Sequence, residues 1–339
     1  MFRVLAASSV AVVALAGCGG GSSHPKASTS SSPAAKSHIK VGLALPGSID
    51  DAGFDQGHYE GVKEAAAKYG FTFTYQDNLN TPEQITDALR NLAATSNIVI
   101  AAGGQFVGPL TSIAAQYPKV QFIVTAGFAQ GKNIHSVVKN WAEQSYVAGV
   151  IAAKTTKVKK VGFIGGLEIP PTQQAQAGFV AGVKATDPAV QVSTTTIGTF
   201  NDPTKAKEAT SAQIAAGDDV IQGFVDAAEP GVTTAVKDSG KNVAIVAGGH
   251  EAAECKLSNQ IVLVTPAQTK DQVLQALASY FNGSLGPVVS VSLSTLTPED
   301  LKASVQLCPG HSDTQLQSLI DTTVQGIVNG SIKVPTGTK

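Results

Sequence analysis

The apolar positions of this chain form short continuous runs that alternate with segments of helical period. Residues 39–45 form an apolar run that is typical of a buried strand. The next segment carries a stripe of apolar residues ending at Tyr69, which predicts a helix over 56–69, and Gly70 stops it. The chain therefore opens with a strand followed by a helix.

The same alternation continues to the end of the sequence. Thr81-Pro82-Glu83-Gln84 is a capping box with proline at the first helical position, and it predicts a helix to about residue 95. Further strands are predicted at 71–75, 98–102, 120–124, 158–164, 190–197, 220–223, 243–246, 261–264 and 288–293. Further helices are predicted at 107–116, 143–154, 172–186, 203–216, 230–238, 266–281 and 313–328. Apolar strands separated by helices indicate parallel sheets covered on both faces, an α/β fold.

The predicted elements divide into two blocks of similar size. The first block ends near residue 139, and a second set of the same units begins after Trp141. The segment beyond about 250 is too short for a third domain. We therefore expect two doubly wound parallel-sheet lobes, with the C-terminal segment returning through both.

Charge and composition restrict the classes of partner that such a protein can bind. The 339 residues include 24 Lys plus Arg and 25 Asp plus Glu, and only 14% are charged. Nucleic-acid binding depends on clustered cations, so we expect no nucleic-acid partner. The same low charge indicates a small neutral ligand or none, and an apolar content of 43% excludes wholesale disorder.

The N-terminus has the layout of an export signal. Residues 1–17 begin with Arg3 and continue with an apolar run that is too short to span a bilayer, which needs about 20 residues. Leu15-Ala16-Gly17-Cys18 resembles the bacterial lipoprotein signal. In that signal the cysteine carries a lipid through a thioether, and the expected acyl chain is palmitate. An ordinary cleaved signal with an incidental cysteine is the alternative. Residues 18–37 are rich in Gly, Ser and Pro and predict a disordered tether.

The two remaining cysteines are Cys255 and Cys308. An even pair in an oxidising compartment predicts a disulfide. Because His250 and His311 stand near them, a zinc site is an alternative, and free buried thiols are another. The spacing is unlike that of zinc motifs, so we expect no metal and no cofactor.

Candidate binding residues come from the loops that follow the strands, because ligands of parallel α/β sheets bind at the carboxyl ends of the strands. These loops contain Asp50, Asp51, Phe54, Asp55, Gln105, Thr125, Phe200, Asp226 and His250. A simpler interpretation of Asp50 or Asp51 is a cap for the helix that begins near Gly53. For Phe54 and Phe200 the simpler interpretation is packing in the core.

Five segments carry a resemblance to a known family. They are Asp50-Asp51-x-x-Phe54-Asp55-Gln56, 145–149 (SYVAG), 160–166 (KVGFIGG), 177–184 (AGFVAGVK) and 198–202 (GTFND). In this order they resemble the basic membrane protein (PnrA-like) family of extracytoplasmic solute-binding lipoproteins, whose studied members bind purine nucleosides for an ABC importer. The resemblance implies the type I periplasmic-binding-protein fold, with two lobes joined by three crossing segments and the ligand between them.

The resemblance also assigns roles to site residues. Phe54 and Phe200 match the aromatic residues that hold the base, and Asp50 or Asp51 matches an acidic contact. Asp55 stands where the family usually has Asn. On the sugar side the chain departs from the family, because it has Thr125 and Gly248-Gly249-His250 at acidic positions and Gln268 at a lysine position.

We accordingly expect one lobe from 38–139 plus 250–285 and the other from 140–249 plus 286–339. Hinges are expected near 133–140, 247–250 and 283–287, where Gly or Pro occurs in two of the three. The expected partners are a nucleoside-like small molecule, ABC permease subunits and the membrane, through the lipid on Cys18. The protein is expected to be a monomer on the extracytoplasmic side of the cell membrane.

Two other function classes can be compared with transport. An enzyme would need a nucleophile with its base, a metal-ligand run or a phosphate loop, and the sequence has no HExxH, GxSxG or GxxxxGK[ST] motif. We therefore expect no enzyme. A membrane-tethered ligand sensor of the same fold, binding a non-nucleoside solute, is the alternative that the sequence leaves open.

Overall fold

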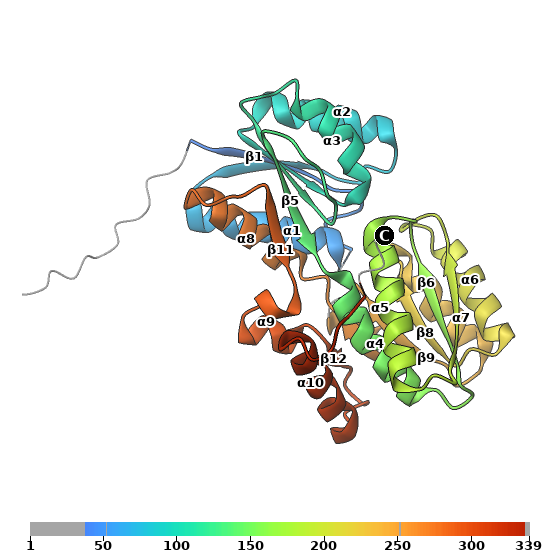
Figure 1. The fold of residues 1–339 in the computed structure, drawn as a ribbon. Helices are drawn as coiled ribbons and strands as arrows, with labels where there is room; N and C mark the ends of the chain where they lie inside the picture. The colour runs from blue at the N-terminus through green and yellow to red at the C-terminus, as the bar shows by residue number, and fades with distance from the viewer. Residues whose placement is uncertain (1–37, 52, 251, 336–339) are drawn as a thin grey trace, which may run out of the picture. The chain divides into compact units, whose positions relative to one another are not determined.

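The computed structural model describes residues 38–335 apart from 52 and 251. The predicted signal segment, Cys18 and the tether lie outside these described residues. Two lobes are visible in Figure 1, each built around its own six-stranded sheet. Within the described part of the chain, no helix combines the length and apolar character needed to cross a membrane.

The first lobe contains one mostly N-terminal sheet with the strand order β11-β5-β4-β3-β1-β2, all of whose pairs are parallel. Its strands are β1 (Lys40–Ala44), β2 (Thr72–Gln76), β3 (Ile98–Ala102), β4 (Gln121–Thr125), β5 (Ile134–Lys139) and β11 (Val288–Val291). Its helices are α1 (Phe54–Tyr69), α2 (Pro82–Thr95), α3 (Val107–Ala114) and α8 (Thr269–Phe281), with the short turn η1 (Gly104–Phe106).

The second lobe repeats this plan with the order β12-β10-β9-β8-β6-β7. Its strands are β6 (Lys160–Gly165), β7 (Gln191–Thr196), β8 (Val220–Phe224), β9 (Ala244–Gly248), β10 (Ile261–Thr265) and β12 (Gln306–Leu307), of which only β12 is antiparallel. Its helices are α4 (Trp141–Thr155), α5 (Pro170–Thr186), α6 (Pro203–Ala216), α7 (Glu229–Ser239), α9 (Pro298–Ala303) and α10 (Thr314–Val328). Short turns are η2 (Asp226–Ala228), η3 (Ala252–Lys256) and η4 (Leu293–Thr295).

The apolar strands form these sheets because both of their faces are covered. Along β3, Val99 and Ala101 pack towards α2 and α3, whereas Ile98 and Ile100 pack towards α1 and α8. Side chains of successive strand residues point to opposite faces, so a strand between two helical layers must be apolar at every position. Because both faces of each such strand are buried, its sequence is a continuous apolar run.

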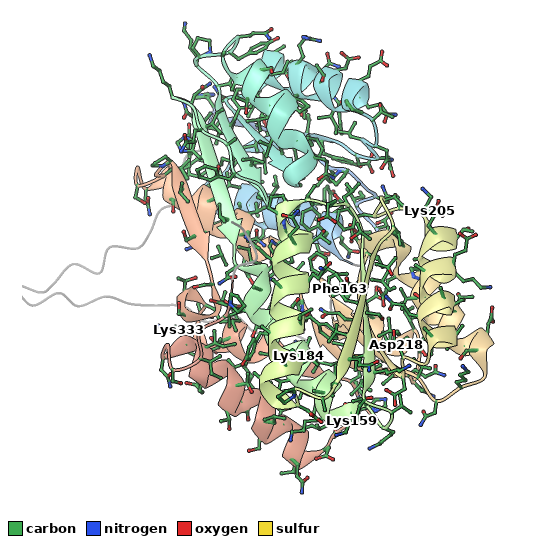
Figure 2. The ribbon with its side chains drawn as sticks, turned by 45° about the vertical axis from the view of Figure 1, so that its right-hand side comes forward. Lys159, Phe163, Lys184, Lys205, Asp218 and Lys333 are labelled. Carbon is green, nitrogen blue, oxygen red and sulfur yellow. A yellow bond between two sulfur atoms is a disulfide. The ribbon has the colours of Figure 1, made fainter. Side chains whose placement is uncertain are left out.

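The second core has a helix pair in unusually close contact. Phe163 on β6 lies within this lobe beneath α4 and α5 (Figure 2), with its ring 6.0 Å from that of Phe179. A Cβ on Gly178 would lie 2.1 Å from the Ala142 carbonyl oxygen, and one on Gly182 would lie 2.0 Å from that of Tyr146. Glycine at these positions lets the two helix backbones touch.

The strand pairing corrects the expected lobe boundaries at 250 and 286. Residues 261–265 form β10, which pairs with β9 in the second sheet, and residues 288–291 form β11, which pairs with β5 in the first. The chain thus crosses near 139–141, 265–268 and 292–297. Only the first expected hinge is near a crossing, because 247–250 stays in the second lobe and 283–287 joins α8 to β11. Both strands are apolar, so their sequences do not say which sheet they join.

Buried polar groups tie the crossing segments together. The Lys139 ammonium donates to the carbonyl oxygens of Pro266 and Ala267 at 3.0 and 2.7 Å. The Gln144 amide donates to Pro266 at 3.0 Å and to Ser304 at 2.7 Å. These bonds tie the first crossing to the second and to the residue after α9, and the Leu293 N–H, in the third crossing, donates to Glu143 of α4 at 2.7 Å.

The expected disulfide is present between Cys255 and Cys308. It joins η3 to the residue that follows β12, 53 residues further along the chain. Because both sulfurs are used in this bond, neither thiolate is available to a metal. Chain-entropy estimates for closing a loop of this size give about 4 kcal/mol of stabilisation.

Candidate functional site

The order of strands fixes where a ligand can bind. In the first sheet β2 and β3 lie on opposite sides of β1, and in the second β7 and β8 lie on opposite sides of β6. At such a switch point the loops leaving adjacent strands go to opposite faces of the sheet and leave a crevice at the carboxyl ends of the strands. The loops after β1, β3, β6 and β8 all contribute to one cavity.

This cavity has a volume of about 410 Å³ and takes residues from both lobes. Its size lies in the range of about 300–1,000 Å³ that small-molecule sites usually have. Its lining is mainly apolar and includes Pro46, Phe54, Leu79, Ile85, Trp141, Leu167, Ile169, Pro171, Phe200 and Phe224. Backbone is exposed at Gly103, Gly104, Gly198, Gly248 and Gly249.

Phe54 and Phe200 both line the cavity. Phe54 is the first residue of α1 and packs against the cores of both lobes. Phe200 comes from the loop after β7, and its ring covers Gly166, where a Cβ would lie 2.1 Å from ring carbon Cδ1. The glycine after β6 therefore makes room for this ring.

Two further aromatic residues line the cavity and were missed in the sequence. Trp141 begins α4 directly after the first crossing, and its ring meets that of Phe224 edge-on at 5.5 Å. The Lys139 ammonium lies 4.5 Å from the Trp141 ring centroid. The position of the single tryptophan at the boundary between two α/β blocks was the available signal.

The polar groups of the cavity are neutral or acidic. Asn80, Gln105, Thr199, Asn201 and Asp226 contribute side chains, and no Lys, Arg or His is among the described lining residues. Asn201 of the second lobe donates to the side chain of Asn80 of the first, so the lobes meet across the mouth of the cavity. This set can bind neutral or positively charged solutes and disfavours phosphates.

The two acidic candidates after β1 have different positions. Asp50 is exposed and lies outside the cavity lining. Asp51 accepts backbone N–H bonds from Gly53, Asp55 and Gln56 at 2.8–2.9 Å. Asp51 therefore serves the first turn of α1, which agrees with the simpler interpretation as a helix cap.

Asp55 and Asp226 lie close to Asp51 and have perturbed acidities. Burial is the main cause that raises the pKa of Asp55 well above its ordinary value, and the charges of Asp226 and Asp51 add to it. Burial and then Asp51 raise the pKa of Asp226 to about 7, although His250 acts in the opposite direction. Asp226 also has φ of 52°, a left-handed conformation that Asp tolerates better than most residues.

Thr125 is fully buried, and its hydroxyl is directed towards a histidine. His58 Nδ1 lies 2.7 Å from the Phe54 carbonyl oxygen, which can only accept, so Nδ1 carries the proton. Nε2 then accepts from the Thr125 hydroxyl at 2.7 Å. Burial lowers the pKa of His58 to about 4, which keeps the ring neutral.

His250 lies between two buried glutamates, next in the chain to two glycines that line the cavity. Its Nε2 is 3.7 Å from Glu229 and its Nδ1 is 3.8 Å from Glu254. Burial lowers the pKa of His250, but the glutamates outweigh it and raise the pKa to about 9. Burial raises the pKa of Glu229 to about 7. The neighbouring Gly248 and Gly249, rather than His250, line the cavity.

Gln268 lies at the second crossing and has φ of 53°. Its amide donates to the Asp300 carbonyl oxygen at 3.1 Å. It lines a separate groove with Gln56, Glu60 and Lys270 instead of the main cavity. The structure therefore brings Phe54, Gln105, Phe200 and Asp226 together in the cavity lining. The other predicted site residues lie outside this lining: Asp50, Asp51, Asp55, Thr125, His250 and Gln268.

Comparison with known proteins agrees with this architecture. Residues 38–284 match the model of the Bmp family, described as ABC transporter substrate-binding proteins of the PnrA-like type. The chain belongs to this family. The Bmp family consists of extracytoplasmic solute-binding proteins and not of enzymes, as the sequence predicts.

Relatives of this Bmp protein include proteins with named ligands. The ABC transporter nucleoside-binding protein BmpA of Lactococcus lactis is 26% identical, over 98% of this chain and 99% of the relative. A purine-binding protein of Brucella abortus is 26% identical, over 57% of this chain and 56% of the relative. The transcriptional activator protein med of Bacillus subtilis is 24% identical, over 72% and 75%.

Solved structures of solute-binding proteins share the fold. An ABC transporter solute-binding protein from Aeropyrum pernix superposes with a TM-score of 0.75 at 19% identity, covering 88% of this chain and 93% of that one. A periplasmic solute-binding protein from Actinobacillus succinogenes with bound D-allose gives 0.63 at 16% identity, covering 75% and 95%. The expected type I architecture is therefore confirmed.

Proposed function

We propose that this protein captures a small planar solute of the purine nucleoside class outside the cytoplasm and delivers it to an ABC importer. The observation that carries the proposal is the interlobe cavity of about 410 Å³, with Phe54 and Phe200 in its wall and no basic side chain in its described lining. Aromatic walls suit a flat ring system, and aromatic pairs contribute about 0.5–1.5 kcal/mol beyond area burial. The nucleoside- and purine-binding relatives support the same ligand class.

The lining also selects among related compounds. A nucleotide would bring its phosphate charge beside Asp226 without a Lys or Arg of the lining to balance it. Neutral donors and acceptors on Asn80, Gln105 and Asn201 can serve the edge of a base or the hydroxyls of a sugar. Because the Thr125 hydroxyl is directed to His58, we expect weaker discrimination among sugars than among bases.

Calorimetry on wild type, Phe54→Ala and Phe200→Ala tests the proposal. We expect wild type to bind a nucleoside and to ignore the corresponding nucleotide and non-aromatic sugars. Each alanine variant should lose about 5- to 150-fold in affinity, since removing a stacking ring costs about 1–3 kcal/mol per base. Phe73→Ala is the control, because that ring lies in the first lobe against Tyr59 and outside the cavity lining. The stacking model is wrong if wild type binds only a sugar or amino acid and both variants retain that binding.

We also propose that Cys18 carries the lipid that holds the mature protein at the membrane. The signal-like segment before it and the Gly/Ser/Pro-rich segment after it support this assignment. Cys18→Ala should release a protein that still binds its solute, as measured by fractionation followed by calorimetry. A variant that stays in the membrane fraction would contradict lipid attachment at Cys18.

A sensor role is the second candidate, and one relative named as a transcriptional activator favours it. Uptake of radiolabelled solute separates the two roles. Deleting the gene should abolish uptake if the protein serves an importer. Unchanged uptake together with lost solute-dependent gene expression would favour the sensor.

A further inference from the structure

Three carboxylates from opposite lobes meet beside the solute cavity. Asp51 and Asp55 follow β1 in the first lobe, and Asp226 follows β8 in the second. One oxygen of each lies within 4.8 Å of the other two. Among the described residues, no Lys or Arg forms an ion pair with any of the three, because the ion pairs lie elsewhere in the chain.

The buried member of this group has an unused oxygen. Asp55 is only 1% exposed, and its Oδ1 has no hydrogen-bond partner among the described residues. Its Oδ2 lies against Gly47, where a Cβ would be 2.5 Å away. Carboxylates this close to one another repel unless a shared proton or a cation lies between them. The free Oδ1 therefore points to a missing partner.

The remaining lone pairs of Asp51 are compatible with the same partner. Among the backbone N–H groups of the described residues, Gly53 and Gln56 donate to its Oδ1 and Asp55 donates to its Oδ2. A carboxylate offers about four lone-pair sites, so one remains on Oδ2. Asp51 can thus cap α1 and still contribute one oxygen.

The dimensions favour a bare ion over a charged group of the solute. Hard divalent cations are held by oxygen ligands at about 2.0–2.6 Å, so two ligand atoms of one ion lie up to about 5 Å apart. Since one oxygen of each carboxylate lies within 4.8 Å of the other two, a single ion can contact all three. Asp226 lines the solute cavity, but Asp51 and Asp55 do not. A solute held in the cavity therefore meets one of the three carboxylates, whereas an ion beside it can reach all three.

We propose that Asp51, Asp55 and Asp226 bind one hard divalent cation, Ca²⁺ or Mg²⁺, which joins the two lobes at the edge of the cavity. Three carboxylate oxygens without nitrogen or sulfur ligands select this class of ion over zinc or copper. Since the ligands come from both lobes, the ion binds the closed arrangement more tightly than an open one. By linkage, the bound ion should tighten solute binding. This consequence rests on the proposed function, whereas the ion site itself does not rest on it.

Terbium luminescence tests the site directly. Tb³⁺ replaces Ca²⁺ at oxygen sites and is sensitised by a nearby tryptophan, and the single tryptophan, Trp141, lines the same cavity as Asp226. Protein treated with chelator and dialysed at pH 7.5 should give Tb³⁺ emission that Ca²⁺ displaces. Calorimetry with CaCl₂ and MgCl₂ then measures the native ions.

Matched variants locate the ion. Asp55→Asn and Asp226→Asn should each weaken Tb³⁺ and Ca²⁺ binding by tenfold or more. Asn keeps the shape of Asp and tolerates the left-handed backbone of residue 226. Asp50→Asn is the control, because it removes a charge from the same loop at an exposed residue outside the triad. Thermal melts without added ions verify that all three variants are folded.

The outcomes are distinct from those of the proposed function. The ion site is wrong if neither Ca²⁺ nor Mg²⁺ binds wild type at pH 7.5, or if the two triad variants bind as well as Asp50→Asn does. The ion site is also wrong if Asp226→Asn weakens the binding of an amine-bearing solute but does not change the binding of any metal ion. Nucleoside calorimetry in excess chelator reports on the proposed function alone, since solute binding there needs no ion.

Discussion

At the residue scale, a cluster of buried ionisable side chains lies near the cavity. His250 lies between Glu229 and Glu254, and all three side chains are buried. Breaking a buried pair by removing one partner leaves an uncompensated charge and is costly. Protonation of this cluster should therefore be visible in the stability of the whole protein.

The first prediction concerns the pH dependence of that stability. The pKa of Glu229 is about 7 in the folded protein against 4.5 ordinarily, so the folded state holds a proton that the unfolded chain releases. The stability from this group is fully present below pH 4.5 and is lost as the pH rises through 7. His250, with a pKa of about 9 against 6.5, adds stability that is present below pH 6.5 and lost as the pH rises through 9.

Urea denaturation of wild type and Glu229→Gln from pH 5 to pH 9 checks this. Wild type should lose stability across this interval, and Glu229→Gln should give a flatter curve because its side chain cannot ionise and no longer supports the charge of His250. Glu208→Gln, an exposed glutamate of α6, should leave the curve unchanged. Parallel curves for wild type and Glu229→Gln would contradict the assignment.

At the element scale, helix contacts depend on residues that have no side chain. In α5, Gly178 and Gly182 touch the backbone of α4. In turn, a Cβ on Gly149 of α4 would lie 2.2 Å from the Phe179 carbonyl oxygen. The segments 145–149 and 177–184, which carried the family resemblance, are the two faces of this contact. Their glycines serve helix packing in the second lobe rather than the ligand.

The matching prediction uses two glycines in different surroundings. Gly182→Ala should destabilise the protein by about 1–3 kcal/mol, because its methyl group must push α4 and α5 apart. Gly108→Ala in α3 meets nothing within 4 Å and should stabilise by up to about 1 kcal/mol. Denaturation midpoints measure both. Equal effects of the two substitutions would mean that α4 and α5 are not in backbone contact.

At the scale of the whole molecule, the described lobes are in a closed arrangement. Phe54 packs against both cores, and Asn80 and Asn201 meet across the cavity mouth. Lys139 and Gln144 hold the crossing segments together on the other side. Such an arrangement allows the lobes to open by rotation about the crossings while each sheet stays intact.

We therefore predict that solute binding contracts the protein. Small-angle scattering should give a smaller radius of gyration with a saturating nucleoside than without it. Asn201→Ala should weaken affinity by a few fold, because a hydrogen bond of this kind contributes about 0.5–1.5 kcal/mol. Identical scattering curves with and without a ligand verified by calorimetry would count against closure.

The sequence alone determined the local structure and the fold class. Apolar runs of four to seven residues, capping signals such as Thr81 to Gln84 and glycine stops are local, so they predicted most helices and strands and the two α/β blocks. The sequence also placed Phe54, Gln105, Phe200 and Asp226 in loops that follow strands, and in the structure all four line one cavity.

Only the tertiary structure decided which sheet each late strand joins and which polar side chains face the cavity. β10 and β11 are both short apolar strands, and their partners are set by which sheet edge is open after the crossings. Thr125 and His250 follow strands, as binding residues do, yet His58 and Glu229 engage them away from the cavity lining. Such choices depend on contacts between residues that lie far apart in the sequence, 67 positions for His58 and Thr125, or on the course of the crossing segments, which local sequence patterns do not record.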